Sequence, residues 1–492
     1  MGSAGGGSHA ISGDELTRLL DACIGKTLRQ LDTAGALGDD ARNKGRAGAV
    51  FEQSVFGYPA DSYQRPDLEV DGTDVELKVT GLVEARRDAA GYGYRAKEPM
   101  SITAVSPDAI VNETFSASAF WHKAEHLLVI YYLYVIPGKG VGLTEYGEFE
   151  VKGWELHEWS QDDRARLEKD WRIVQSYVRV AVWGNARDEL MPGLSSVVNR
   201  LLLYLDTAPK WPHAPRFRLK NSVVTQMARE HFGERLEQLP RRVESELTSM
   251  DEVDAYLRGI AELHAGKTLG ELARLCGVDV GADRQSKQLA EQVACGLLGS
   301  SSKKMSRIDL FAKASLLFKS VVITERGGRT EDMKLLPINF DELLAPDAVF
   351  EDSEFSMTFS QSQLMCFVLK EPRTGGLLSD NVFLGFKRVW LGDLLEEVHG
   401  VWSEMRRLVF DGELRDVPVL DRNGVQRRSP KTGLPMSAPN WPKSSGGNVF
   451  VRGGSSDASN KPVEVAGVRM YRQSLWLKGA WVCSRLYEAH WV

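Results

Sequence analysis

The chain has 492 residues, which is too long for one compact core and predicts roughly two to four domains. Its net charge of −6 excludes a protein that coats nucleic acid through bulk positive charge, but it allows basic residues to line a single cleft. No apolar run is long enough to span a bilayer, and the five cysteines form no CxxC pair. The sequence therefore predicts a cytoplasmic protein with neither a membrane anchor nor a zinc site.

The chain begins with a glycine- and serine-rich stretch, for which we expect a flexible tail over residues 1–10. Short segments of the first half then recur, in order, in the second half. The matched pairs are residues 25–31 with 266–272, 65–68 with 307–310, 75–79 with 316–320, and 217–220 with 475–478. The repeat predicts two related domains, residues 11–235 and 251–492, joined by a polar linker at residues 236–250.

A strand is predicted over residues 73–79, and it carries the residues most typical of a nuclease. Glu76 and Lys78 are two residues apart, so both project from one face of this strand, with apolar residues on the other face. Asp67 follows a proline, which favours an extended chain. A turn at residues 71–72, Asp-Gly, would bring Asp67 beside Glu76.

Two carboxylates and a lysine suit metal-dependent hydrolysis of a phosphodiester. Mg²⁺ takes oxygen ligands from one or two carboxylates and lowers the pKa of a bound water. A nearby lysine can orient the nucleophile and stabilise the charge that develops on the phosphate. An ordinary surface hairpin with a Glu–Lys pair would show the same short motif, so the motif alone leaves both interpretations open.

Two later segments are candidates for contact with DNA. Residues 210–220 contain four basic residues and no acid, which is typical of a groove-reading loop or of a solvated basic loop. The glycine-rich stretch at residues 448–456, with Arg452, occupies the equivalent region of the second half. Its glycines allow close approach to phosphate, but they suit a flexible linker equally well.

In this order, the motifs resemble the MutH-like endonucleases. The resemblance rests on residues 44–52, 66–67, 76–78, 122–123 and 217–220, with a second copy that begins near residue 268. The tandem layout is similar to that of type II restriction enzymes that cut GATC with one catalytic domain and one inactive MutH-like partner. It implies an α/β fold with two tandem restriction-endonuclease-like domains, each a mixed central sheet flanked by helices.

The resemblance also implies roles for individual residues. Glu52, Asp67 and Glu76 are expected to hold Mg²⁺, with Mn²⁺ as a substitute, and Lys78 and Lys123 are expected to complete the catalytic set. DNA contacts are expected from Lys44, Arg46, Lys210, Arg216, Arg218, Lys220, Arg452 and Lys478.

The second half differs from the first at one decisive position. It has Leu317 where the first half has Glu76, although Asp309 and Lys319 are retained and Glu291 lies near the position of Glu52. Replacing a metal-binding carboxylate with leucine removes a charge and a ligand together. We therefore expect the second half to bind DNA as an inactive regulatory copy.

Two positions depart from the family pattern and bear on the target sequence. Arg218 stands where the family has a base-contacting tyrosine, and Ala208 stands where an arginine is expected. Arg218 is expected either to read guanine or to contact phosphate. The resemblance implies GATC as the target, and these two changes argue against a simple transfer of that specificity.

The sequence thus predicts a Mg²⁺-dependent, sequence-specific endonuclease of the type II restriction kind that acts on double-stranded DNA and uses no nucleotide cofactor. Cutting both strands predicts DNA-dependent self-association or sequential nicking by a monomer. The alternatives are a repair-like nickase that cuts one strand and a modification-sensing DNA-binding protein that does not cleave.

Overall fold

A computed structural model describes most of the chain. The described residues are 9–38, 45–58, 66–84, 93–135, 146–208, 214–280, 287–328, 331–346, 348–373, 375–421, 423–429, 433–454 and 461–492. The chain forms two compact units: unit 1 comprises residues 1–137, 141–257 and 294–317, and unit 2 comprises residues 138–140, 258–293 and 318–492. Within the described ranges, no helix has the length and apolar character needed to cross a membrane.

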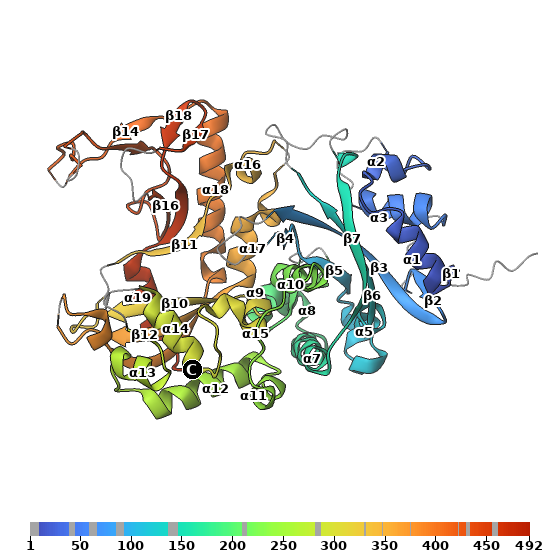
Figure 1. The fold of residues 1–492 in the computed structure, drawn as a ribbon, viewed down its shortest axis with the longest axis horizontal. Coiled ribbons are helices and arrows are strands. Elements are labelled where there is room, and N and C mark those ends of the chain that lie inside the picture. Colours follow the sequence, from blue (N-terminus) through green and yellow to red (C-terminus); the bar gives the residue numbers. More distant parts are fainter. Residues whose placement is uncertain are drawn as a thin grey trace, which may run out of the picture. The chain divides into compact units, whose positions relative to one another are not determined.

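The central sheet of unit 1 contains the predicted nuclease strand (Figure 1). This mixed, six-stranded sheet has the order β1-β2-β3-β6-β7, with β4 also paired to β3. Its strands are β1 (His9–Ile11), β2 (Leu68–Val70), β3 (Thr73–Glu84), β4 (Tyr94–Ala96), β6 (His126–Leu133) and β7 (Glu150–Glu158). The parallel pairing of β3 with β6 sets Glu76 opposite Leu127, in the largely buried strand β6.

A second, three-stranded sheet in unit 1 has the order β5-β9-β8. Its strands are β5 (Met100–Ala104), β8 (Leu205–Ala208) and β9 (Arg216–Leu219). The helices of unit 1 include α1 (Gly13–Asp21), α2 (Leu28–Leu31), α3 (Arg46–Val50), α4 (Pro107–Ile110), α5 (Ala119–Ala124), α7 (Gln161–Trp183), α8 (Arg187–Leu190), α9 (Leu194–Val198), α10 (Asn221–His231), α11 (Arg241–Glu246) and α15 (Asp309–Lys313). Helix α12 (Met250–His264) crosses the boundary between the units.

Unit 2 also contains sheets and helices. Its sheets have the orders β10-β12-β13 and β11-β19-β16, and two small hairpins pair β14 with β15 and β17 with β18. The strands are β10 (Leu316–Ile323), β11 (Met333–Pro337), β12 (Gln363–Lys370), β13 (Val382–Trp390), β14 (Asp416–Pro418), β15 (Ser437–Pro439), β16 (Val449–Gly453), β17 (Val463–Val465), β18 (Val468–Met470) and β19 (Gln473–Leu477). The helices include α13 (Leu269–Leu275), α16 (Phe340–Leu343), α17 (Glu354–Gln361), α18 (Leu395–Phe410) and α19 (Gly479–Glu488). Helix α14 (Lys287–Leu297) and strand β10 each have a few residues in unit 1.

The same local contacts recur in the two units. In each, a threonine begins a short helix with a reciprocal capping box, and the glycine just before it bonds to the last strand of the central sheet. In each, a buried serine begins the helix that leads into the central strand. The matching hydrogen bonds are Gly25 N to Val151 O, Gly266 N to Phe383 O, Ser118 Oγ to Phe115 O, and Ser353 Oγ to Phe350 O. The two units therefore share these local contacts as well as sequence segments.

Unit 1 extends past the predicted linker. Residues 241–246 form helix α11, and Glu244 is buried with its Oε1 2.6 Å from Nη2 of Arg166 on α7. Residues 294–317, which the sequence assigns to the second domain, also pack in unit 1. The predicted second domain, residues 251–492, therefore does not coincide with unit 2.

A buried lysine attaches the 294–317 segment to the rest of unit 1. Lys313 Nζ on α15 lies 3.0 Å from Asp309, 3.5 Å from Asp163 on α7 and 3.6 Å from Glu230 on α10. These carboxylates raise the pKa of Lys313 despite its burial. Because Asp163 lies 150 residues away in sequence, no local pattern indicates this cluster.

Candidate active site

A tight hairpin brings Asp67 next to Glu76, as the sequence predicts. Strands β2 and β3 pair from Leu68 with Val75 to the turn, where residues 71 and 72 have φ of 47° and 83°. This left-handed pair is the geometry that an Asp-Gly turn favours between twisted strands. Oδ2 of Asp67 accepts a hydrogen bond from the backbone N–H of Leu77 at 2.8 Å, which fixes the carboxylate beside β3.

Glu76 is the centre of the site. Its side chain is only 4% exposed, and it accepts hydrogen bonds from Lys78 Nζ at 2.7 Å and from Lys123 Nζ at 3.0 Å. Both lysines are largely buried as well, with side chains 19% and 12% exposed. Because side chains alternate in direction along β3, Lys78 lies on the same face as Glu76. Lys123 reaches Glu76 from another element.

Helix α5 supplies Lys123. The Ser118 hydroxyl caps this helix by accepting from Trp121 N at 3.1 Å, and Phe120 and Trp121 are buried beneath it. The ring of Phe120 contacts Phe217 on β9, with 5.0 Å between the ring centroids. These anchors orient the last turn of the helix so that Lys123 meets Glu76, 47 residues earlier in the chain.

Burial and the neighbouring carboxylate shift the titration of Asp67. Burial raises the pKa of the Asp67 carboxyl, and the neighbouring Glu76 raises it further, against the opposing effects of the Leu77 N–H and the two lysines. Two carboxylates are thus held close together in a poorly solvated site. Such an oxygen donor set fits Mg²⁺, which binds one or two carboxylates and keeps several waters.

The structure brings together two of the three carboxylates expected to bind metal. Glu52 lies in a short π-helical turn, η1 (Phe51–Val55), of the kind that is frequent at functional sites. Within the described part of the chain, however, no three His, Cys, Asp or Glu side chains are close enough to hold a metal ion together. Asp67 and Glu76 therefore form the carboxylate pair, and the role of Glu52 rests on the family resemblance.

The basic residues expected to contact DNA lie in different environments. Arg216 on β9 is exposed, whereas Arg218 on the same strand forms a two-bond ion pair with Asp206, both bonds 2.8 Å. Lys220 is fully buried, and its Nζ donates to Leu202 O at 2.7 Å. The structure thus corrects the expectation that Lys220 contacts DNA, because this side chain lies inside the protein, just before α10. Lys44 and Lys210 lie outside the described residues.

Three further candidates differ in exposure. Arg46 is buried at the start of α3, with its guanidinium 5.7 Å from the centroid of the Tyr146 ring. In unit 2, Arg452 is exposed on β16, and Lys478 is partly buried at the start of α19. Asp206 is missing from the predictions because a lone aspartate before a basic loop gives no signal. Its pairing with Arg218 becomes visible only once strands β8 and β9 are aligned.

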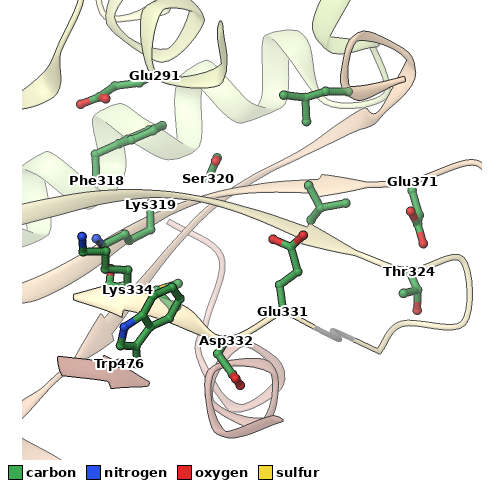
Figure 2. Close-up of a pocket in the computed structure, with 13 residues that line it drawn as sticks. Glu291, Phe318, Lys319, Ser320, Thr324, Glu331, Asp332, Lys334, Glu371 and Trp476 are labelled. Carbon is green, nitrogen blue, oxygen red and sulfur yellow. Dashed lines mark hydrogen bonds between the residues drawn. The ribbon is translucent and has the colours of Figure 1, made fainter. Parts of the chain in front are cut away.

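Unit 2 has a cavity of about 530 Å³ beside the strand that corresponds to β3. Figure 2 shows Lys319 of β10 and Lys334 of β11 beside Trp476 of β19, with Glu331 and Asp332 at the same cavity. Lys319 Nζ donates to Lys334 O at 2.8 Å, and burial lowers its pKa. Glu291 on α14 also lines the cavity and opposes this shift.

The catalytic pair of unit 1 has no counterpart in this cavity. Leu317 occupies the position of Glu76, as the sequence indicates. Asp309, expected to persist as the counterpart of Asp67, begins α15 in unit 1 and forms an ion pair with Lys313. In the second copy, helix α15 thus stands where the first copy has the β2 hairpin. The retained Asp309 does not line the cavity that contains Lys319.

Comparison with known proteins finds two similarities. Residues 56–170, which contain Asp67, Glu76, Lys78 and Lys123, match the family model described as "DNA mismatch repair enzyme MutH". Over most of its length, the chain is also similar to a type II restriction enzyme. The relative is "Type II restriction enzyme Sau3AI" of Staphylococcus aureus, 22% identical over 417 residues that cover 79% of this chain and 78% of the relative.

Proposed function

We propose that this protein is a Mg²⁺-dependent endonuclease that cuts both strands of DNA at a specific sequence, with catalysis in the first half and DNA binding without cleavage in the second. The observation that carries the proposal is the close grouping of Asp67, Glu76, Lys78 and Lys123 in unit 1. This set can hold a hard cation and surround a phosphate with positive charge. In the proposed division, residues 11–235 form the catalytic domain and residues 251–492 the DNA-binding domain.

Each side chain has a distinct task in this proposal. Asp67 and Glu76 would hold the Mg²⁺ ion, which supplies a water of lowered pKa and stabilises negative charge on the phosphate. Lys78 orients the attacking water, which approaches the phosphorus opposite the leaving oxygen. Lys123 balances charge on the non-bridging oxygens as the transition state forms. Since both lysines donate to Glu76, the carboxylate also keeps them directed into the site.

Removal of the metal is the simplest test of this chemistry. With Mg²⁺, the purified protein should convert supercoiled plasmid into discrete linear fragments, and an excess of chelator should abolish cleavage and leave the plasmid supercoiled. Persistent nicked circles would instead identify a nickase. Specific binding without cleavage of either methylated or unmethylated plasmid would indicate a modification-sensing protein and contradict the proposal.

The second half is proposed to contact the same or another DNA copy through Arg452 and Lys478 and to regulate cleavage. Regulation of this kind requires that binding there changes the rate or affinity at the first site. A short duplex that carries one target and is itself resistant to cleavage should therefore change the cleavage rate of a second, cleavable duplex. Sedimentation with and without DNA would reveal any DNA-dependent dimer.

The replacement Lys319→Ala tests the assignment of catalysis to the first half. Lys319 corresponds to Lys78, but it has leucine at position 317 in place of a carboxylate. We expect the variant to keep the single-turnover cleavage rate within about twofold at saturating DNA, because Leu317 stands where the first half has the carboxylate of Glu76. A loss as large as that of Lys78→Ala would show that the second half takes part in the chemistry.

A further inference from the structure

Unit 2 contains a β-ribbon where unit 1 has short helices. Strands β8 and β16 correspond, because each pairs with the strand that leads into the helix begun by Lys220 or Lys478. In unit 1, residues 184–204 join α7 to β8 and form short helices that include α8 and α9. In unit 2, nearly twice as many residues, 411–448, join α18 to β16 and form the hairpin of β14 and β15 (Figure 1). We call residues 415–439 the arm.

The base of the arm is fixed to the rest of unit 2. Strands β14 and β15 form an antiparallel ladder there. The Asp416 carboxylate accepts from the Ser437 hydroxyl and lies 3.7 Å from Nζ of Lys461. Trp441, just beyond the arm, is buried. The outer part of the arm therefore extends from an anchored base.

The outer part continues the ribbon with two arginines on opposite faces. Backbone hydrogen bonds link Val419, Arg427 and Met436, so three segments of the arm meet there. The pairing continues with a bridge between Arg428 and Pro435. Because neighbouring side chains of an extended segment alternate in direction, Arg427 and Arg428 project from opposite faces.

Both faces of the outer part are exposed. Leu420, Val425 and Leu434 are 55%, 62% and 65% exposed, and Arg427 and Arg428 are exposed as well. A ribbon without a core of its own is marginally stable in water, and clustered exposed apolar side chains are typical of an interaction site. The outer part is therefore suited to a partner that covers it on two sides.

The charge of the arm indicates the kind of partner. Residues 415–439 include five basic and two acidic residues, a net charge of +3 in a chain whose net charge is −6. Asp416 is held at the base, and Asp421 accepts from two backbone N–H groups of its own turn. Arg428 Nη1 donates to Gly433 O at 2.9 Å, which orients the side chain without neutralising its charge. The exposed arm thus suits a polyanion.

A groove of DNA matches the charge and the exposure together. The major groove of B-DNA is about 12 Å wide and admits a two-stranded β-ribbon. Phosphate backbones form both of its walls, so a ribbon inside it is covered on two faces and meets negative charge on each. Thymine methyl groups on the groove floor suit apolar side chains. A protein surface would cover one face and leave the arginine of the other face in water.

We propose that the arm enters the major groove of DNA bound by the second half, where Arg427 contacts the phosphates of one strand and Arg428 those of the other. The inference rests on the proposed function, since it requires that the second half binds DNA. It adds a contact that is separate from Arg452 and Lys478 and that the catalytic half does not share.

Shortening the arm tests the proposal. Replacing residues 419–436 with Asn-Gly closes the β14–β15 ladder with a two-residue turn. Affinity of the full chain for a plasmid-derived duplex is measured in Ca²⁺ over a series of salt concentrations. The shortened protein, and the double variant Arg427→Gln with Arg428→Gln, should bind more weakly, with a slope of log affinity against log salt lower by about two. Arg241→Gln with Arg242→Gln, which removes two adjacent exposed arginines from α11, is the matched control and should keep the wild-type slope.

A modified duplex tests the position of the arm. Glucosylated hydroxymethyl groups on cytosine fill the major groove, so the wild-type and shortened proteins should bind such a duplex with equal affinity. If shortening weakens binding to the modified and unmodified duplexes by the same factor, the arm does not lie in the major groove and the proposal is wrong. Unchanged affinity and slope on the unmodified duplex would overturn it as well.

Sedimentation without DNA tests a protein partner. The wild-type and shortened proteins should sediment alike, and loss of a dimer on shortening would assign the arm to a second copy of the chain instead. If shortening lowers the melting temperature, the double arginine variant, which keeps the arm, decides the outcome. Because binding in Ca²⁺ needs no cleavage, failure of the proposed nuclease function would be seen separately in the plasmid assay.

Discussion

Replacement of Glu76 with glutamine is expected to lower the cleavage rate at least about a hundredfold while DNA binding persists. Glutamine keeps the shape of the side chain, but it removes the charge that would hold the metal and direct both lysines. One negative charge fewer also reduces repulsion of the phosphate, so affinity for DNA in Ca²⁺ should be unchanged or tighter. Single-turnover cleavage and equilibrium binding measured on the same duplex distinguish the two effects.

A control on the same strand makes this test specific. Glu84 is exposed at the far end of β3, so Glu84→Gln changes the charge by the same amount and should cut at the wild-type rate. Calorimetric titration with Mg²⁺ should show binding by wild-type protein and by Glu84→Gln, and much weaker binding by Glu76→Gln. Near-normal cleavage by Glu76→Gln would mean that the active site lies elsewhere.

The part of this site formed by local structure could be predicted from sequence. Alternation along one strand places Glu76 and Lys78 on the same face, and a two-residue turn brings Asp67 back beside them. Lys123 lies on a helix 47 residues away in sequence and could be anticipated only through the family resemblance. Short-range rules thus identify the strand and turn, whereas the second lysine depends on how a capped helix packs against the sheet.

The residues that could not be predicted depend on long-range burial. Lys220 belongs to a basic segment that resembles a DNA-binding loop, yet its Nζ is buried against Leu202 O, beneath the hairpin. Asp309 follows the repeat in sequence, but the chain around it forms a helix in unit 1. In both cases the charge pattern is real, and tertiary packing decides whether the charge faces solvent or the interior.

Replacement of Lys313 with methionine is expected to cause the largest loss of stability among the substitutions considered. Lys313 is 7% exposed and is the cation shared by Asp163, Asp309 and Glu230. Removing one partner of a buried ion pair leaves its carboxylates uncompensated and costs about 3–5 kcal/mol. Thermal unfolding should therefore begin roughly 10 °C lower.

The pH dependence identifies the cause of this loss. Lys313 and Arg166 lower the pKa of Asp163, so the stability that Asp163 contributes is present above its unfolded pKa and is lost as pH falls through its folded pKa. In Lys313→Met this lowering is weaker, so the stability gap between variant and wild type should narrow only as pH falls below about 3.9, the unfolded pKa of an aspartate, and through the lower folded pKa of Asp163 in the wild type.

An exposed ion pair on α7, the helix that carries Asp163, provides the comparison for Lys313. Arg172→Gln removes the ion pair with Glu168 on α7 and should cost less than about 1 kcal/mol, because both side chains are solvated. If Lys313→Met unfolds like Arg172→Gln at neutral pH, the lysine does not compensate the buried carboxylates. If instead Lys313→Met is much less stable than Arg172→Gln, a chain that ends at residue 250 should be similarly unstable. Such a chain lacks residues 294–317, so the sequence repeat would not mark where the catalytic unit can be separated from the rest of the protein.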